Sequence, residues 1–545
     1  MEKKENKLGD SVVKKDWTVM VYLAGDNNLA EEMVFALKSL YSVGSSKNVQ
    51  VVALYDTNGA MVPFDIPVRR ASEVTADHDL KQGEESFLKF KEQVSKASKK
   101  SEPITTEQKE FLRRLERLHL TGSVNAILQG FIADTIARFE ASHYALILSG
   151  HGSGAVGDFL TSAKHFFSLT IPGLGRVLRG VKAQFQKTET GKLDILGFDS
   201  CLMSMAEVAY EVKDCVSYMV GAEGSEANTG WPYDRILRLL HHNPNPRDFA
   251  KKIVDEYIKC YTDYTVADLS VDLSALDLGR LDKLVDALGK NPEDRGNHKE
   301  PPLSQVMKDG LASPRFPDDV KDAVKDAIVL AHWEAQGYKN EQYVDLWDFC
   351  DRLQRRTNKI GGKLGSEIRN ACIRVKNAIQ PDRGQDQGLA FRSGYRGAAF
   401  QHSHGVSVFF PWAKLTDAAG ISDLEHYSLL DFANHTRWDE FLSAYVDKTI
   451  GPPRRGENDK LRHSFLNHRP FLYTGKPGKE PQANFREPQA NFREPQANFR
   501  EPQANFRGSS LGEALKIASM KNPPINWYEQ YEQYGEYLRA AAKSD

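Results

Sequence analysis

The sequence predicts an α/β fold in which a mainly parallel sheet carries helices on both faces, followed by a largely helical region and a flexible tail. Three observations support this expectation. Short apolar runs alternate with helical runs over the first half of the chain, as in a parallel sheet. Long helical patterns dominate beyond about residue 240, and a repetitive stretch poor in apolar residues follows residue 450. A chain of this length can form roughly two to four domains.

The sheet domain is expected to cover residues 16–240, after a charged and disordered segment at 1–15. Residues 76–120 are charge-rich and helical in composition, so we expect an inserted surface pair of helices there. Three helices are expected in this domain. One follows the first strand, one begins after a cap at Ser123, and one begins at Cys201. The expected strands are WTVMVYLA, VQVVALYD, HYALILS, LDILGF and VSYMVG.

The remaining chain divides into a second domain and a tail. Residues 241–450 are expected to form a mostly helical domain with a short strand in GVSVFFPW. The tail, residues 451–545, contains EPQANFR four times between residues 480 and 507. Each repeat holds one large apolar residue and one proline, which excludes a coiled coil or packed core and predicts an extended linker. The end, NWYEQYEQYGEYLRAAA, is expected to form an amphipathic helix that could dock.

Composition excludes several classes of function. The 72 basic and 74 acidic residues nearly balance, so no net field attracts nucleic acid or an anionic membrane, and protein or peptide partners are expected. No apolar run reaches the length of a signal peptide or a membrane span, so we expect a cytoplasmic protein. The five scattered cysteines include no C-x-x-C pair, which argues against a disulfide framework and a zinc site.

Motifs of several other enzyme classes are missing. GHGSG and GLGRVLRG are glycine-rich, but neither completes a dinucleotide-binding motif or a P-loop, and no G-x-S-x-G elbow of a serine hydrolase occurs. No H-E-x-x-H cluster or twelve-residue calcium loop is present. We therefore expect no metal site and no required cofactor. The histidines expected at the surface are His241, His242, His402 and His404.

Cys201 has two interpretations. Free cysteines are commonly buried and inert, so it could be a small core residue. It also follows the strand LDILGF and is expected at the first turn of the next helix. Unpaired backbone N–H groups and the helix dipole at that position would favour a nucleophilic thiolate.

His151 is the best candidate for a base beside Cys201. It follows the strand ALILS, and the loops after parallel strands gather at one edge of a sheet. Gly150 and Gly152 leave space around its ring. The N–H groups of Gly152 and Cys201 could then bind an oxyanion. The alternative is that His151 is an ordinary loop histidine.

A set of segments, taken together, points to one family. These are WTVMVYLAGDNNLA, ALILSGHGSG, DILGFDSCLMSMAEVAYE, GWPYD, YVDLWDFCDRL and GVSVFFPW. They resemble segments of the clostripain-type cysteine peptidases of the caspase-like clan CD, in the family's order, from about Trp17 to Val446. The joint presence of GHG and DSC makes the resemblance specific, and it implies a caspase-like fold for the sheet domain.

The resemblance also implies site residues. His151 and Cys201 would form the catalytic dyad, and Asp199 would lie at the floor of the pocket that selects arginine or lysine before the scissile bond. A carboxylate suits that role because it pairs with a guanidinium through two charge-assisted hydrogen bonds. Asp199 could instead cap the following helix. Candidates for the other side of the pocket are Glu223, Glu226 and Trp231, of which Trp231 could equally be a buried aromatic residue.

The implied function is an intracellular cysteine endopeptidase that cleaves proteins after Arg or Lys and is held as a regulated, self-processing zymogen. An upstream activating protease or regulatory protein is an expected partner, and calcium could assist. A catalytically silent binding or regulatory protein of the same fold is the alternative. Candidate self-cleavage sites between the dyad residues are Lys164, Arg176, Arg179, Lys182, Lys187 and Lys192.

The repeats in the tail gain a function under this interpretation. Each repeat ends in Phe-Arg, so the tail could be a self-substrate or a tethered competitor, helped by a roughly millimolar effective concentration. A passive, recently duplicated linker explains the repeats equally well. The arginines in question are Arg486, Arg493, Arg500 and Arg507.

Overall fold

A computed structural model of the protein describes most of the chain between residues 14 and 449. The expected disordered N-terminus, the helical insertion at 76–120 and the tail from residue 451 lie outside the described residues, apart from Lys14 and Lys15. The described ranges are 14–57, 60–67, 124–157, 159–162, 167–263, 270–289, 300–338, 342–380, 387–412, 423–428 and 430–449.

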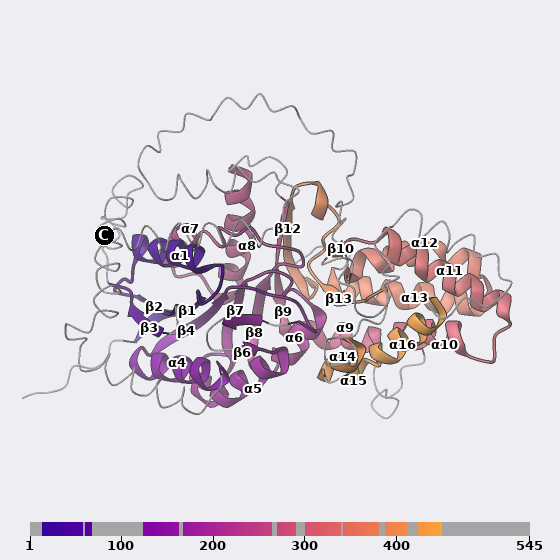
Figure 1. Cartoon of the computed structure of the whole chain (residues 1–545), viewed down its shortest axis with the longest axis horizontal. Helices are drawn as coiled ribbons and strands as arrows, with labels where there is room; N and C mark the ends of the chain where they lie inside the picture. Colours follow the sequence, from indigo (N-terminus) through magenta and orange to yellow (C-terminus); the bar gives the residue numbers. More distant parts are fainter. Residues whose placement is uncertain are drawn as a thin grey trace, which may run out of the picture. The chain divides into compact units, whose positions relative to one another are not determined.

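An eight-stranded sheet forms the centre of the molecule (Figure 1). Its middle strands run parallel in the order β8, β7, β4, β1, β2, and they match the strands expected from the sequence. Antiparallel strands complete both edges. Along the sheet the strands are β12 (Ala390–Arg396), β9 (Val271–Asp277), β8 (Val216–Gly221), β7 (Leu193–Asp199), β4 (Ala141–Ser149), β1 (Lys15–Ala24), β2 (Val49–Thr57) and β3 (Ala60–Asp65).

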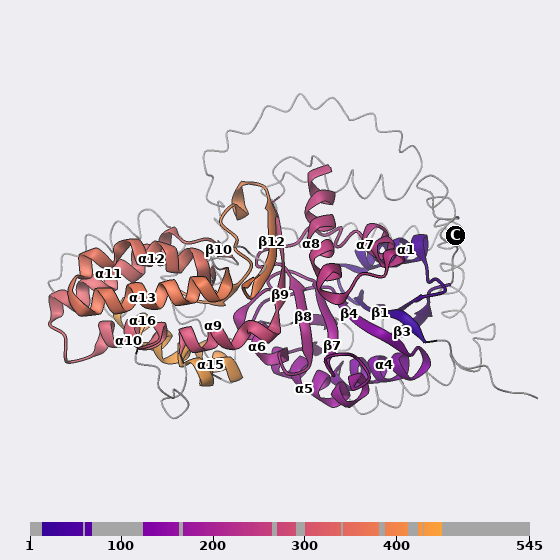
Figure 2. The ribbon, with the colours of Figure 1, turned by 180° about the vertical axis from the view of Figure 1, so that it is seen from behind.

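Helices cover both faces of this sheet, as expected (Figures 1 and 2). The first face carries α1 (Ala30–Val43), α7 (Tyr233–Leu239) and α8 (Pro246–Asp263), whose apolar side chains join those of the strands in one core. The opposite face carries α4 (Val124–Arg138), α5 (Ile171–Val181) and α6 (Ala206–Val212). The mainly parallel α/β architecture is therefore confirmed.

Three strands of this sheet, β3, β9 and β12, were not expected from the sequence. Strands β9 and β12 lie beyond residue 241, so the expected domain boundary near residue 240 falls inside the sheet. The reason is visible in β9, VDLSALD, whose polar residues look like loop signals but are buried. Asp272 accepts hydrogen bonds from the N–H groups of Glu223 and Gly224 at 2.8 and 2.9 Å, which compensates its burial.

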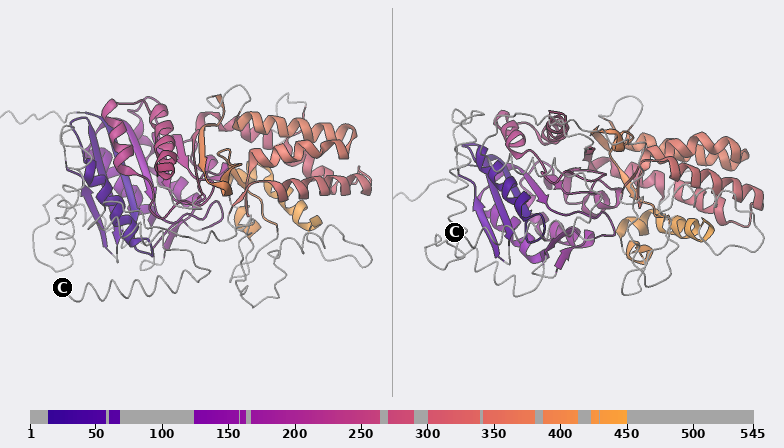
Figure 3. Two further views of the ribbon diagram at one scale, coloured as in Figure 1. Left: turned by 90° about the horizontal axis from the view of Figure 1, so that it is seen from above. Right: turned by 45° about the horizontal axis from the view of Figure 1, so that its top comes forward.

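The rest of the region after residue 241 is largely helical, as predicted. The long helices α11, α12 and α13 run side by side (Figure 3). A small sheet, in the order β10, β11, β13, adjoins them, and β13 is the strand expected in GVSVFFPW. The elements are α9 (Leu281–Leu288), α10 (Leu303–Ala312), α11 (Asp318–Glu334), β10 (Gly337–Tyr338), β11 (Tyr343–Asp345), α12 (Leu346–Ile360), α13 (Gly362–Ile379), β13 (Ser407–Phe409), α14 (Asp423–Tyr427), α15 (Asp431–Thr436) and α16 (Trp438–Thr449). Among the described helices, none combines the length and the apolar character that crossing a membrane requires.

Candidate active site

The ends of the adjacent strands β4 and β7 bring His151 and Cys201 to neighbouring loops. The parallel register pairs Ser149 with Asp199, so each candidate lies two residues beyond a paired position. The N–H of Gly150 donates to the carbonyl of Asp199 at 3.1 Å, which extends the pairing into the loops. The histidine and cysteine loops therefore meet at one edge of the sheet, as the sequence predicts.

Gly152 makes the closest approach between these loops. A Cβ atom built on Gly152 would lie 2.2 Å from the carbonyl oxygen of Cys201, far inside van der Waals contact. Only glycine fits at this position. In the described part of the chain, the N–H groups of Gly152 and Cys201 donate to no backbone carbonyl, and the N–H of Cys201 faces its own sulfur.

Cys201 does not lie at the start of a helix, which corrects the sequence-based expectation. Cys201 and Leu202 form a turn, Met205 forms an isolated β-bridge with Ser407, and α6 begins only at Ala206. Leu202 in this turn has φ of 65°, in the left-handed region that residues with a Cβ rarely adopt. Burial, with a second contribution from Glu226, raises the pKa of the Cys201 thiol to about 11. Without a bound substrate the residue is a thiol at neutral pH, rather than the thiolate that a helix N-terminus would favour.

A loop after β8 holds this turn in place. The N–H of Leu202 donates to the carbonyl of Gly224 at 2.9 Å, and the N–H of Ser204 donates to that of Ala222 at 2.8 Å. The N–H of Glu226 donates to Sγ of Cys201 at 3.2 Å. The loop after β8 thus contacts the sulfur of Cys201 and also the backbone of the residues that follow Cys201.

His151 has a partner that the sequence analysis did not name. Its Nε2 lies 2.5 Å from Oδ1 of Asn28, in the loop after β1. Burial lowers the pKa of His151, so the ring is neutral at neutral pH. When Nε2–H donates to Asn28, Nδ1 is left as the basic nitrogen. The signal in the sequence was the polar GDNN turn after the first strand, because β1 is the neighbour of β4.

Asp199 is a buried acceptor and does not cap a helix. Its carboxylate accepts hydrogen bonds from the hydroxyls of Ser149 and Tyr233, both at 2.7 Å, and from the N–H of Trp231 at 3.0 Å. The helix-cap alternative is wrong because the next helix begins seven residues later, at Ala206. Burial raises the pKa of Asp199, while these donors oppose the rise.

Glu226 joins Asp199, as the sequence suggested. Its Oε1 accepts from the indole N–H of Trp231 at 3.3 Å, and its Oε2 is buried without a donor in the described residues. Burial first, and then the charge of Asp199, raise the pKa of Glu226 well above its ordinary range. A negative charge on either of these two carboxyl groups makes the other harder to ionise. Trp231 itself is buried, with its ring against Gly197, and so is a core residue whose indole N–H reaches Glu226.

Glu223 does not belong to this pocket, although the sequence placed it there. Its Oε2 accepts from the N–H of Gly405 at 2.6 Å, and its pKa is raised well above the usual range by burial and by Asp345 and Asp272. His404 belongs to the same cluster rather than to the open surface, because its ring stacks on Trp347 with centroids 4.1 Å apart.

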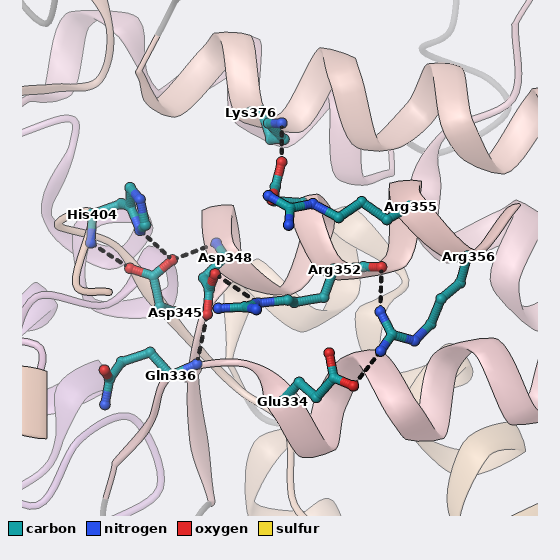
Figure 4. Close-up of polar contacts among 10 residues, drawn as sticks. Glu334, Gln336, Asp345, Asp348, Arg352, Arg355, Arg356, Lys376 and His404 are labelled. Carbon is teal, nitrogen blue, oxygen red and sulfur yellow. Dashed lines mark hydrogen bonds and ion pairs between the residues drawn. The ribbon is translucent and has the colours of Figure 1, made fainter. Parts of the chain in front are cut away.

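Figure 4 shows how Asp345 anchors this second cluster. The Asp345 carboxylate accepts from the N–H groups of Asp348, at 2.6 Å, and His404, at 2.5 Å. Nδ1 of His404 lies 3.3 Å from the same carboxylate, which raises the pKa of the imidazole against the effect of burial. Asp348 in turn accepts from Arg352 at 3.1 Å. The cluster therefore connects α12 with the loop before β13.

The candidate self-cleavage sites fall into different surroundings. Arg176 and Arg179 lie within α5, and Lys182 begins the short 3₁₀ helix after it. Lys187 pairs with Glu140 at 2.9 Å, and Lys192 donates to the carbonyl of Lys213 at 2.8 Å. The candidates outside the described residues are Lys164, which lies between β5 (Phe159–Ser162) and β6 (Phe167–Leu169), and Arg486, Arg493, Arg500 and Arg507.

Metal binding finds no support in the described ranges, where no group of three or more His, Cys, Asp or Glu side chains is arranged to hold an ion. The acids of the two clusters are instead occupied by backbone N–H groups, hydroxyls and each other.

The chain is similar to several known proteins. Clostripain from Hathewaya histolytica is 24% identical over 326 residues, which cover 52% of this chain and 56% of that protein, so the match spans little more than half of the relative. Similar solved structures include a secreted C11 cysteine protease from Bacteroides thetaiotaomicron in complex with an irreversible peptide inhibitor. It is 13% identical, the TM-score is 0.43, and the match covers 78% of this chain and 99% of that one. An inactive zymogen C11 protease from Parabacteroides distasonis has 14% identity, a TM-score of 0.43 and coverage of 77% and 98%. The model of the clostripain family matches residues 21–445. Because this match spans most of the sequence and both strand-end motifs, the chain belongs to the clostripain family.

Proposed function

We propose that this protein is a cysteine endopeptidase that cleaves after Arg or Lys with His151 and Cys201 as its dyad. The observation that carries the proposal is the contact between the two strand-end loops, in which Gly152 packs directly on the carbonyl of Cys201. This contact joins a half-buried thiol, a neutral histidine and two N–H groups that donate to no backbone carbonyl in the described residues, at one edge of the sheet. Each of these parts is needed for acyl transfer.

The reaction follows from these groups. Neutral His151 takes the proton of the Cys201 thiol, and the sulfur attacks the carbonyl carbon of the scissile peptide bond. The N–H groups of Gly152 and Cys201 donate to the oxyanion of the tetrahedral intermediate. The imidazolium then protonates the leaving amine, and water, deprotonated by His151, releases the acyl group from sulfur.

The carboxyl pair of Asp199 and Glu226 supports a preference for a cationic side chain before the scissile bond. A guanidinium or ammonium group would neutralise the pair and could donate to Oε2 of Glu226, which no donor among the described residues occupies. Asp199 would act mainly through its charge, because its oxygens already accept from Ser149, Tyr233 and Trp231.

Control by self-processing is part of the proposal. Peptidases bind substrates in extended form, so cleavage after Arg176 or Arg179 would first require α5 to unwind. Cytoplasmic location, an upstream activator and calcium assistance remain predictions of the sequence.

A direct test compares the wild type with Cys201→Ala and His151→Ala by mass spectrometry, after incubation with a peptide library. We expect the wild type alone to cleave, after Arg or Lys, and to process itself. The alternative, a silent binding protein, gains some support from the raised pKa of the thiol. Peptide cleavage that survives in Cys201→Ala would contradict the dyad, and a wild type without cleavage would favour the silent protein.

The tail is tested separately, since its repeats are proposed as a self-substrate or tethered competitor. Full-length protein and a form ending at Gly451 are compared on an Arg-ended reporter peptide. Tail fragments ending in Phe-Arg, or faster turnover by the truncated form, would support the role. Equal rates without fragments would leave the repeats as a passive linker.

A further inference from the structure

We propose that a cation bound at Asp199 and Glu226 activates Cys201, so that substrate selection and activation of the nucleophile are one event. This inference rests on the proposed peptidase function and deepens it. It assigns Glu226 a role beyond lining the pocket, as the residue that connects the bound side chain to the sulfur.

The geometry of Glu226 carries the inference. The main-chain N–H of Glu226 donates to Sγ of Cys201 at 3.2 Å. Its side-chain carboxyl group lies next to that of Asp199 and accepts a hydrogen bond from the indole N–H of Trp231 at 3.3 Å. One residue thus contacts both the nucleophile and the pocket. Its Oε2 is buried and receives no hydrogen bond from the described residues, which leaves one acceptor for a ligand that carries N–H groups.

The charges around the sulfur explain the direction of the effect. The charged groups that face Cys201 are Glu226 from the loop after β8 and Asp199 from β7, and both are acidic. His151, from the loop after β4, is neutral because burial lowers its pKa. Negative charge near a buried thiol opposes its ionisation, so this site holds the sulfur in its protonated form until a positive charge arrives.

Binding of a cationic side chain reverses this situation. The positive charge of the guanidinium or ammonium group offsets the negative charge of the two acids, so the thiol loses its proton more readily. The thiol proton then passes to His151, and the thiolate attacks the carbonyl. A peptide with a neutral side chain would meet a thiol even when it is correctly placed. Selectivity would therefore appear in kcat as well as in KM.

The experiment measures the reactivity of Cys201 without any peptide. Full-length protein is alkylated with iodoacetamide over a range of pH, in the presence of ethylguanidinium or of its neutral analogue ethylurea, and the rate at Cys201 is followed by mass spectrometry. The other four cysteines are buried, so the modified residue can be assigned. We expect ethylguanidinium, and not ethylurea, to accelerate alkylation about tenfold at neutral pH, the effect of lowering the thiol pKa by one.

Variants separate charge from geometry. Glu226→Gln removes the acidic group but keeps the N–H that contacts Sγ. Alkylation of Cys201 in this variant should therefore be fast without a cation and should gain little from one. Glu189→Gln, at an exposed site, is the control and should behave as the wild type. Asp199→Asn provides a second charge-neutral variant if Glu226→Gln does not fold. Equal rates with both compounds, in a protein that still cleaves after Arg, would overturn the inference and leave the proposed function intact. Equal rates in a protein that cleaves nothing would overturn both.

Discussion

Nε2 of His151 and Oδ1 of Asn28 lie 2.5 Å apart, and this contact selects the form of the imidazole that can act as a base. The neutral ring has one N–H, and the carbonyl of the amide accepts it at Nε2. Nδ1 then carries the lone pair. In the proposed mechanism Asn28 is therefore a positioning residue, since it would act on the substrate only through His151.

Removal of this partner should lower turnover without unfolding the protein. We expect Asn28→Ala to reduce kcat about tenfold to hundredfold, because general-base catalysis contributes about 10²–10⁴ and depends on the ring's orientation. Asn28 is exposed, so thermal stability should be unchanged. The measurement is kcat on an Arg-ended peptide together with a melting curve. Unchanged kcat would show that Asn28 has no part in the reaction.

The pH dependence of the same pair gives a second prediction. Burial lowers the pKa of His151, so the wild type should keep its base neutral into mildly acidic solution, and the acidic limb of kcat/KM should lie below the ordinary histidine value of 6.5. Asn28→Asp would still accept from Nε2–H but would add a negative charge, which favours the imidazolium. Its acidic limb should move to higher pH. An unshifted limb in this variant would contradict the pairing.

The contact between Gly152 and Cys201 predicts a steric effect. A methyl group at Gly152 cannot coexist with the Cys201 carbonyl, so Gly152→Ala must displace one of the two loops. We expect kcat/KM to fall about hundredfold or more, the usual effect of misplacing catalytic groups by about 1 Å. Gly180→Ala in α5 is the matched control, since its new methyl meets only the side chain of Gln129, which can rotate. Similar activity of both variants would mean that the loops are not in contact.

The hydrogen bonds of Asp199 predict graded losses in specificity. Asp199→Asn removes the charge, so kcat/KM for Arg-ended peptides should fall by a factor corresponding to about 2–5 kcal/mol. Tyr233→Phe removes one donor to the carboxylate and should cost about tenfold, as for a hydrogen bond to a charged group. Kinetics on matched peptides ending in Arg and in citrulline measure both effects. If Asp199→Asn keeps the same preference for Arg over citrulline, Asp199 does not select the substrate.

Glu207 predicts how stability depends on pH. It is 1% exposed and accepts from the N–H of Phe409 and the hydroxyl of Tyr427, and burial raises its pKa from 4.5 to about 7. The folded protein therefore holds a proton that the unfolded chain releases. The stability that Glu207 contributes is fully present below about pH 4.5 and is lost as the pH rises through about 7. The free energy of unfolding falls by about 3 kcal/mol over this range.

Glu207→Gln should flatten this dependence. Urea unfolding at several pH values would measure the slope, with Glu189→Gln as the control because that side chain is exposed. Asp56 and Asp272, whose pKa values are also raised to about 7, act in the same direction and will leave part of the slope in place. A slope that is identical in Glu207→Gln and wild type would show that Glu207 is not protonated in the folded protein.

Much of the candidate site could be predicted from the sequence because it depends on local patterns. The apolar runs before His151 and Cys201 identify buried parallel strands, and neighbouring parallel strands end at the same edge. The glycines on both sides of His151 were expected to leave space around its ring, whereas the structure shows Gly152 in close contact with the carbonyl of Cys201. These features required no knowledge of residues distant in the chain.

Other features depend on partners far away in the sequence and could not be predicted in this way. Glu223 and Glu226 are three residues apart in one loop, yet Glu223 turns to Gly405 and Glu226 to Asp199. Strand β9 carries Asp272 in its interior, because that carboxylate caps two N–H groups of the same loop. Polar residues of this kind resemble loop residues until their partners are known.

The sequence by itself determined the parallel sheet, the two strand ends and the residue types that face each other there. Only the tertiary structure decided the chemical state of those residues. Burial and the charges packed around them make the thiol and the carboxyl group of Glu226 harder to ionise, and burial lowers the pKa of the histidine. Those surroundings are built from segments as distant as Asn28 and Trp231, and folding alone brings them together.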